Sequence, residues 1–545
     1  MQSWGLTVDK FLDHAKKWHG QREIVTRSIE GPITRTNYFN VHERAKKLSS
    51  GLIDMGIKPG DRVGTLAWNT SRHLEVWFGT MGIGAVCHTL NPRFTADQLA
   101  YIINHASDRI IFTEHAFLQQ LESIRERIPS VEKIIVLSDS LPDSESSTSV
   151  INYESLIDGG DTDIEWGNFP EDTAAGLCYT SGTVGNPKGV LYSHRSNFLH
   201  TLASSSTDIF SLSARDVVLI SVPMFHANAW GLTFLCPAMG AKMVLPGQKL
   251  DGPSLHELIE TEGVTFSAAV PTVWQMLLTH LRQSKSKLTS LTRILVGGAA
   301  VPASLARAYQ DEFGVKVIHA WGMTEVSPIG TVNTPTAETI TLSEEEQFRA
   351  SLNQGRATML TDIKIVDQDG EDLPHDGLAS GRLMVRGPYV VDRYFGDAPD
   401  TERLDDEGYF DTGDIATIDQ NGFMKIVDRS KDIIKSGGEW ISSAEIETLI
   451  LSHPHVDLAA VIGIPHEKWT ERPLLVLKLK TDAERTKESF LSFLDGKVAK
   501  WWVPDDVVFV NDMPVGPTGK IDKKLVRQSL AGYKWSENPA THSRP

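Results

Sequence analysis

The chain has 545 residues, of which 41% are hydrophobic and 23% charged, and it carries a formal net charge of −17. This length exceeds what one hydrophobic core supports, so at least two domains are expected, and the acidic surface argues against nucleic acid and anionic membranes as partners. No stretch of about 18 apolar residues and no secretory leader is visible, which predicts a cytoplasmic protein. The cysteines lack the spacing of a metal site or a disulfide framework.

A glycine-rich loop is the first segment that indicates chemistry. Residues 174–178 form an apolar run, and residues 179–189 follow it with the sequence YTSGTVGNPKG. Glycines, hydroxyls and one lysine after a strand supply backbone N–H groups and a positive charge, which suit phosphate oxygens. The loop is not a Walker A motif, because Pro187 precedes Lys188 and Gly189 follows it. The alternative for this segment alone is an ordinary polar loop.

Apolar runs then alternate with helical patterns up to about residue 330. The expected strands are 217–222, 242–245, 266–270, 294–296 and 317–319. Strands that alternate with helices predict a parallel sheet covered on both faces. One unit passes from the strand at 294 through Gly297 and Gly298 into a helix that opens at Pro302. Ligands of such sheets bind beyond the carboxyl ends of the strands, which is where Gly297 and Trp321 are expected.

The sequence changes character after Asp414, where turns and short strands are expected. Glycines at 413, 422, 437 and 438 punctuate this part of the chain. We predict a boundary that gives domains 1–427 and 428–545, the second with about 115 residues, a usual size for a domain.

The loop at 179–189 resembles the signature of the adenylate-forming, or AMP-binding, superfamily, which includes acyl-CoA synthetases, luciferases and the adenylation domains of peptide synthetases. Further segments match in the same order: VPMFH at 222–226, GGAA at 297–300, WGMTE at 321–325, YFDTGD at 409–414, DRSKD at 428–432 and PTGK at 517–520. The resemblance implies an α/β fold, with a large N-terminal domain of mixed and parallel sheets layered with helices and a small mobile α+β C-terminal domain.

The resemblance further implies an ATP-dependent ligase that forms an acyl-adenylate and passes the acyl group to coenzyme A. Three segments, NAW at 228–230, YSHR at 192–195 and HAWG at 319–322, look most like medium-chain acyl-CoA ligases, including those that act on 3-methylmercaptopropionate. ATP, Mg²⁺ and coenzyme A are the expected cofactors and co-substrates. A homodimer formed through the large domain is a further possibility that the resemblance raises.

Catalysis of this kind needs positive charge where two anions meet. Lys188 and the loop from Thr180 to Gly185 are expected to hold the β- and γ-phosphates. Glu325, with the Thr180 hydroxyl, is expected to bind Mg²⁺, and Lys520 to bridge the substrate carboxylate and the α-phosphate. Lys520 belongs to the small domain, so closure of that domain would complete the site.

Other roles also follow from the resemblance. Asp414 is expected at the ribose with Arg429 nearby, although Asp in a Thr-Gly-Asp sequence is by itself more often a turn residue. Trp321 stands where the family usually has Tyr, and it is expected to stack on adenine. Val184 stands where the family usually has Thr, and the loss of that hydroxyl predicts weaker phosphate binding. The expected nucleotide- and CoA-binding residues are Thr180, Ser181, Gly182, Thr183, Gly185, Lys188, Gly298, Ala299, Ala300, Trp321, Gly322, Met323, Thr324, Glu325, Asp414, Arg429, Lys431, Lys435, Gly437, Gly438 and Trp440.

The acyl site is expected just past a strand end. By resemblance, His226 would form a wall near the substrate carboxylate, Trp230 would gate the acyl tunnel, and Asn228 and Gly297 would line it. A lone His or Trp after a strand is more often a packing residue. Two other functions stay open at this point: a luciferase-like oxygenase that shares the first half-reaction, and a non-catalytic nucleotide-binding protein on the same fold. Retention of Lys188, Glu325, Asp414 and Lys520 argues against the latter.

Overall fold

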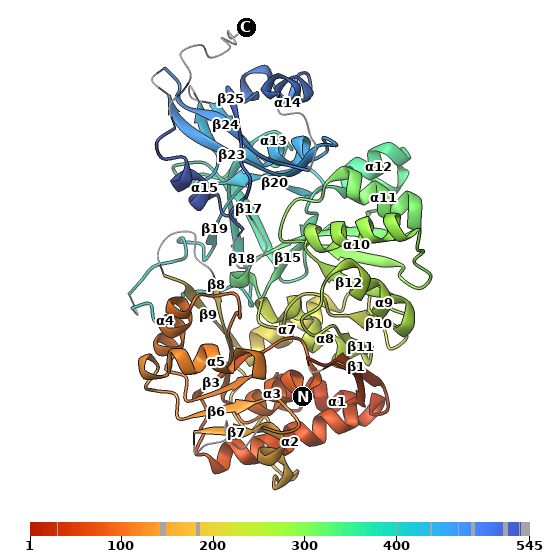
Figure 1. The fold of residues 1–545 in the computed structure, drawn as a ribbon, viewed down its shortest axis with the longest axis vertical. Coiled ribbons are helices and arrows are strands. Elements are labelled where there is room, and N and C mark those ends of the chain that lie inside the picture. Colours follow the sequence, from red (N-terminus) through yellow and green to blue (C-terminus); the bar gives the residue numbers. More distant parts are fainter. Residues whose placement is uncertain are drawn as a thin grey trace.

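The computed structural model of the chain describes residues 1–545 apart from 30, 142–148, 181–185, 399, 437–438, 467, 481–485, 516–520, 534 and 536–545. Its elements form a large body and a smaller C-terminal domain, which is coloured blue in Figure 1. Among the described residues, no helix combines the length and apolar character needed to cross a bilayer.

Two sheets dominate the large body. The first has the order β7 (Val150–Asn152), β6 (Lys133–Val136), β5 (Ile110–Thr113), β3 (Arg62–Leu66), β4 (Val86–Thr89), β8 (Ala174–Thr180) and β9 (Lys188–Ser193). The second has the order β16 (Arg356–Ala357), β15 (Ile329–Val332), β14 (Lys316–Gly322), β13 (Arg293–Val296), β12 (Phe266–Ala269), β10 (Val217–Leu219), β11 (Lys242–Leu245), β1 (Glu23–Arg27) and β2 (Ile33–Asn37). The central strands of both are parallel, and antiparallel strands such as β9 and β2 lie at their edges.

Helices cover these sheets. The α-helices of the described residues are α1 (Asp9–His19), α2 (Tyr38–Asp54), α3 (Ser71–Gly82), α4 (Ala96–Ala106), α5 (His115–Ser123), α6 (Tyr153–Asp158), α7 (His194–Ser204), α8 (Leu232–Met239), α9 (Gly252–Glu262), α10 (Pro271–Ser284), α11 (Ala303–Phe313), α12 (Glu344–Ser351), α13 (Ser443–Ile450), α14 (Lys487–Leu494) and α15 (Lys523–Ser529). One buried apolar cluster joins α1, α2, α3 and α8 to both sheets. Separate clusters pack α9, α10 and α11 on the other face of the second sheet, and α4 and α5 on the other face of the first.

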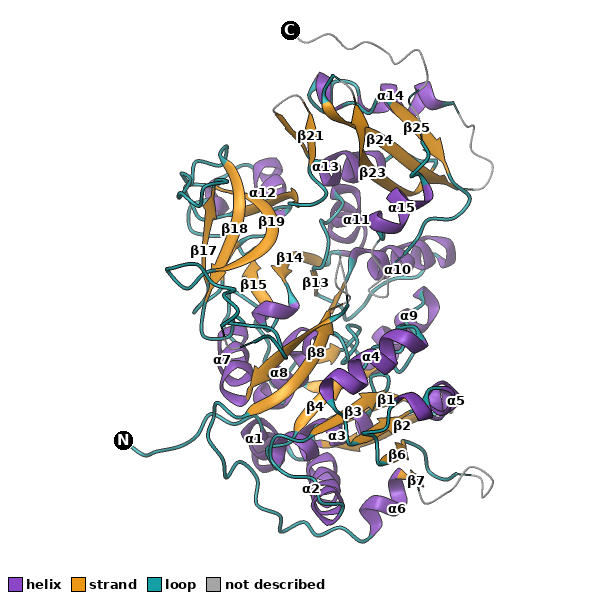
Figure 2. Ribbon diagram, turned by 90° about the vertical axis from the view of Figure 1, so that its left-hand side faces the viewer, coloured by secondary structure: helices purple, strands orange, loops and turns teal. Residues whose placement is uncertain are grey.

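The remaining strands form two smaller antiparallel systems. A four-stranded sheet runs β17 (Asp362–Val366), β18 (Ser380–Arg386), β19 (Phe410–Ile418) and β20 (Met424–Arg429). The C-terminal sheet runs β22 (Glu439–Ile441), β21 (Ile434–Ser436), β24 (Thr470–Leu479) and β23 (Val456–His466), and β25 (Asp506–Phe509) pairs with β24. Helices α13 and α14 pack on one face of that sheet and α15 on the other, seen at the top of Figure 2.

The predicted fold class is confirmed. The strands expected from 242 to 319 appear as β11 to β14, and the helix expected at Pro302 is α11, with Pro302 as its N-cap residue. The C-terminal strands are longer than expected, since β23 has 11 residues and β24 has 10. The step from the four-stranded sheet to the C-terminal sheet falls between β20 and β21, and the boundary at 427 and 428 stays a prediction.

Candidate functional site

The loop expected to bind phosphate lies between paired strands. Thr180, at the end of β8, is the cross-strand partner of Lys188, which is exposed at the start of β9. Ser181, Gly182, Thr183 and Gly185 lie outside the described residues, as do Gly437, Gly438 and Lys520. The two ends of the loop are therefore fixed by the antiparallel pairing of β8 with β9.

A buried carboxylate faces this loop from the second sheet. Glu325 follows β14 and is 7% exposed, and its Oε1 accepts a hydrogen bond from the Tyr394 hydroxyl at 2.8 Å. The ammonium of Lys188 lies over the Tyr394 ring, 4.6 Å from its centre. The structure thus brings together the predicted metal-binding carboxylate and the predicted phosphate-binding cation, with a tyrosine between them.

Burial raises the pKa of Glu325, because desolvation disfavours the charged carboxylate, while the Tyr394 hydrogen bond and the nearby charges of Arg429 and Lys188 lower it. A cation bound beside Glu325 would therefore stabilise the charged form of this carboxylate. Among the described residues no group of His, Cys, Asp and Glu forms a complete metal-binding cluster. One carboxylate fits Mg²⁺, which is usually held by one or two carboxylates together with substrate phosphates and water.

The sequence did not reveal Tyr394. Its position is set by the segment 391–395, which hydrogen-bonds to both halves of the site. The Val391 N–H donates to the Glu325 carbonyl and the Phe395 N–H to the Gly189 carbonyl, both at 2.8 Å. No spacing rule could have paired Tyr394 with Glu325, which lies 69 positions earlier.

A second group lies around Asp414, which is buried on β19. Arg429 is its cross-strand neighbour on β20, and the Arg429 Nε contacts Asp414 Oδ1 at 2.8 Å. The indole N–H of Trp321 donates to Asp414 Oδ2, also at 2.8 Å. Trp321 therefore holds the carboxylate that is expected to bind ribose, which is a contact that the expected stacking on adenine did not anticipate.

The remaining WGMTE and GGAA residues surround the ends of β13 and β14. Gly298 has a positive φ of +78°, and Ala299 and Ala300 are exposed. Gly322 and Met323 are half-buried, and the Thr324 carbonyl accepts a hydrogen bond from the Tyr192 hydroxyl. The roles assigned to these residues stay predictions.

The segment after His226 adopts an unusual backbone. Ala227, Asn228, Ala229 and Trp230 all have positive φ, between 44° and 58°, and form a left-handed turn ahead of α8. Each non-glycine residue in this region costs about 1–2 kcal/mol. The end of the Trp230 ring lies 3.2 Å from the point where a Cβ on Gly297 would stand, so these two predicted acyl-site residues are in contact. His226 is half-buried at the start of the turn.

The predicted hinge residue Asp428 contacts the C-terminal domain directly. Its Oδ2 accepts hydrogen bonds from the backbone N–H and the hydroxyl of Ser443, both at 2.6 Å, at the start of α13. Lys523 of α15 donates to the same hydroxyl at 2.7 Å and pairs with Glu447 at 2.8 Å. Lys431 and Lys435 are exposed and Trp440 is half-buried near this junction. Strand β20, which carries the predicted hinge residue, and the two helices are thus joined by one largely buried polar cluster.

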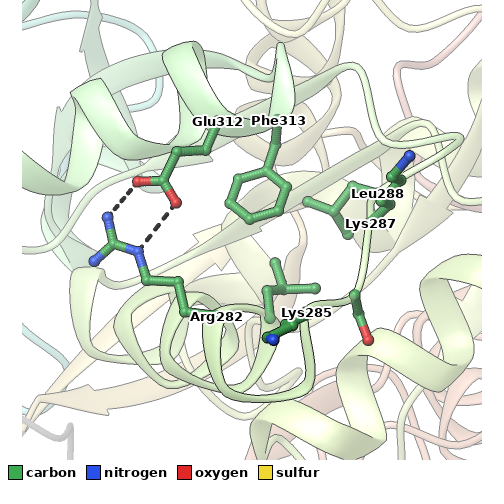
Figure 3. Close-up of a pocket in the computed structure, with 8 residues that line it drawn as sticks. Arg282, Lys285, Lys287, Leu288, Glu312 and Phe313 are labelled. Atoms are coloured by element: carbon green, nitrogen blue, oxygen red, sulfur yellow. Dashed lines mark hydrogen bonds and ion pairs between the residues drawn. The ribbon is translucent and has the colours of Figure 1, made fainter.

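A shallow pocket lies elsewhere, between the ends of α10 and α11, with a volume of about 390 Å³ (Figure 3). An ion pair between Arg282 and Glu312 borders it, and Lys285 and Lys287 stand on its rim. None of its lining residues belongs to the groups described above.

Comparison with protein families and relatives agrees with this geometry. The family described as AMP-binding enzyme matches residues 11–395, and its C-terminal domain family matches residues 445–520. A 3-methylmercaptopropionyl-CoA ligase of Ruegeria lacuscaerulensis is 49% identical, over 97% of this chain and 98% of its own. A medium-chain-fatty-acid–CoA ligase of Ectopseudomonas oleovorans is 47% identical, over 96% of each chain.

Solved structures share the fold. The anthranilate CoA ligase AuaEII, in complex with anthranoyl-AMP, superposes with a TM-score of 0.86 at 23% identity and covers 96% of this chain and 98% of its own. ATP-bound MatB from Rhodopseudomonas palustris gives 0.82 at 24% identity, over 96% and 99%.

Replacing Trp321 by Phe tests the contact with Asp414. The variant keeps an aromatic ring but removes a donor from a buried carboxylate, a loss of about 1–3 kcal/mol. We expect the Kd for ATP, measured by calorimetry without acid, to rise about tenfold, which corresponds to about 1.4 kcal/mol.

Trp274→Phe is the matched control for this change. Trp274 is buried on α10, and its indole nitrogen has no hydrogen-bond partner among the described residues. ATP affinity should be unchanged in this variant. Equal losses in the two variants would show that the Trp321 hydrogen bond does not support nucleotide binding.

Proposed function

The chain belongs to the AMP-binding enzyme family, and from this premise we propose that it is an ATP-dependent acid–thiol ligase. It converts a carboxylic acid, ATP and coenzyme A into an acyl-CoA, AMP and pyrophosphate through an acyl-adenylate. The observation that carries the proposal is the buried Glu325 carboxylate, held by Tyr394 beside Lys188 at the mouth of the glycine-rich loop. The near full-length identity with named CoA ligases supports it.

The proposed substrate is a medium-chain fatty acid or 3-methylmercaptopropionate, the acids named for the two relatives above. Both are unbranched acids with a flexible apolar tail, and a thioether sulfur is close to a methylene group in size and polarity. The buried surroundings of Trp230 and Gly297 suit such a tail.

In the first half-reaction, a carboxylate oxygen of the acid attacks the α-phosphorus of ATP, and the bond to the pyrophosphate oxygen breaks. Negative charge accumulates where the two anions meet, so positive groups that are already in place lower the barrier. Lys188 and the loop it closes bind the β- and γ-phosphates, and Lys520 bridges the carboxylate and the α-phosphate. Asp414 accepts the ribose hydroxyls, while Arg429 and Trp321 hold its orientation.

Glu325 and the Thr180 hydroxyl are the proposed Mg²⁺ ligands. When bound there, the ion neutralises phosphate charge and orients the leaving pyrophosphate. Tyr394 keeps the Glu325 carboxylate aimed at this position through its hydroxyl.

In the second half-reaction, the coenzyme A thiol loses its proton and attacks the acyl carbonyl carbon, and the bond to the AMP oxygen breaks. We propose that the C-terminal domain turns about Asp428 between the two steps, which withdraws Lys520 and brings Lys435, Gly437, Gly438 and Trp440 to the pantetheine arm. The direct contacts of Asp428 with Ser443 support a coupling between the hinge and this domain.

A luciferase-like oxygenase is the alternative, since it would share adenylate formation. Production of an acyl-CoA thioester separates the two. We propose measuring pyrophosphate release and thioester formation over acids from acetate to long-chain fatty acids, with 3-methylmercaptopropionate and aromatic acids included. Release without thioester would refute the ligase, and absence of release with every acid would refute adenylation.

Replacing Lys520 by Ala should separate the half-reactions. Loss of the bridging cation should reduce acyl-AMP formation, read by ATP–pyrophosphate exchange, by at least about a hundredfold, as for other groups that stabilise developing charge. Conversion of supplied acyl-AMP to acyl-CoA should stay within about twofold of the unmodified protein. Lys524→Ala, at an exposed lysine on α15, is the control and should leave both rates unchanged. Equal losses in both half-reactions of Lys520→Ala would contradict domain alternation.

Trp230→Ala should alter the specificity for the acid more than the KM for ATP. Removing the indole opens the space over Gly297, so kcat/KM for acids longer by several methylenes should rise relative to short ones, by about tenfold, while the KM for ATP stays constant. An unchanged chain-length profile would remove Trp230 from the acyl site.

A further inference from the structure

The left-handed turn at 227–230 is the most strained stretch of backbone among the described residues. Elsewhere in that part of the chain, non-glycine residues with positive φ, such as Ser107, Lys285 and Leu360, occur singly, whereas here they follow one another without interruption. L-residues avoid this conformation, and Asn tolerates it better than Ala or Trp. A turn of this kind persists only where its surroundings hold it in place.

Hydrogen bonds within the turn and from neighbouring residues hold it in place. The side-chain amide of Asn228 donates to the Asn197 side chain on α7 at 3.0 Å, and the Thr233 hydroxyl donates to the Asn228 carbonyl at 3.3 Å. Within the turn, the Ala229 N–H donates to the His226 carbonyl at 3.2 Å. Asn228 therefore tolerates a positive φ better than most non-glycine residues, and its side chain also fixes the turn to the neighbouring helix α7.

The turn determines where the Trp230 indole lies. With this backbone, the ring reaches across to Gly297 at the end of β13 and lies 3.2 Å from the point where a Cβ would stand. A right-handed backbone at 227–230 would direct Trp230 elsewhere, since the side-chain direction follows φ and ψ. The position of the ring is therefore tied to a backbone state that carries strain.

We propose that Asn228 and Ala229 are specificity-determining residues, which set the acyl-chain length accepted by the protein through the stability of the left-handed turn. This inference rests on the ligase function proposed above. The turn keeps the indole against Gly297 and favours short acids. A longer acid must displace the ring, and relaxation of the strained backbone offsets part of the free energy of that displacement.

Ala229→Gly is the central variant, because glycine adopts positive φ without strain and only a methyl group is lost. The turn becomes more stable, so kcat/KM for a four-carbon acid relative to a ten-carbon acid should rise at least about fivefold, and the melting temperature should increase by about 1–2 °C. Asn228→Ala removes both the tolerant residue and the link to Asn197, so the same ratio should fall by a similar factor. Asn228→Gly keeps the tolerance but removes the link, and its ratio should lie between those of the two other variants.

Lys285→Gly is the matched control. Lys285 has a φ of +54° at the C-cap of α10, on the rim of the pocket in Figure 3, away from the acyl site. It should raise the melting temperature as Ala229→Gly does and leave the chain-length ratio unchanged. The ratio thus separates an effect on specificity from general stabilisation.

Two outcomes distinguish the inference from the function on which it rests. If the unmodified protein releases pyrophosphate and forms thioester, but Ala229→Gly keeps its chain-length ratio, the turn does not set specificity and the inference is overturned. If the unmodified protein shows no activity with any acid, the proposed ligase function fails instead. If Asn228→Ala does not fold, Ala229→Gly decides the question by itself.

Discussion

The burial of one carboxylate, that of Glu325, is the constraint on which the arrangement of the site depends. Taking a carboxylate out of water is costly unless a donor or a cation accompanies it. Here the donor is the Tyr394 hydroxyl, and the Lys188 ammonium lies over the face of the same ring. The chain as a whole is strongly acidic, so attraction of a nucleotide must come from such local groups. The backbone contacts of 391–395 with Glu325 and Gly189 hold Tyr394 in this position.

A similar principle operates at the junction of the domains. Lys523 lies among the acidic groups of Glu447 and Asp428, and these charges raise its pKa, while burial by itself would lower it. The same cluster fixes the first turn of α13 to the hinge strand through Ser443. Buried ion pairs add little net stability but strongly penalise wrong arrangements, because a separated partner is left charged and desolvated. The cluster therefore stabilises the arrangement of β20, α13 and α15 that the structure shows.

Sequence reasoning predicted what depends on local pattern. The strands near 242, 266 and 294 were recognisable because each is a short apolar run before a helical pattern, and the ordered motifs identified the family. Contacts made by tertiary structure were not predictable. Trp321 lies 93 positions from Asp414, and the sequence does not indicate whether its indole stacks on a ligand or donates a hydrogen bond. Tyr394 stands in a segment with no motif, and the backbone contacts of Val391 with Glu325 and of Phe395 with Gly189 place it at the site.

The turn at 227–230 shows the limit most clearly, because local preference there points the wrong way. The sequence of residues 227–230, Ala-Asn-Ala-Trp, precedes an apolar helix and favours an earlier start of α8. Among these four residues, only Asn228 is of a type that often adopts a positive φ. The observed backbone exists because Asn197, Thr233 and the Gly297 surface select it together. Conflict between local preference and observed structure is expected mainly where function requires it, since strain without use is readily removed by substitution. A glycine at position 229 would remove part of the strain. The alanine found there keeps the turn strained, which lowers the free energy needed for the proposed displacement of Trp230.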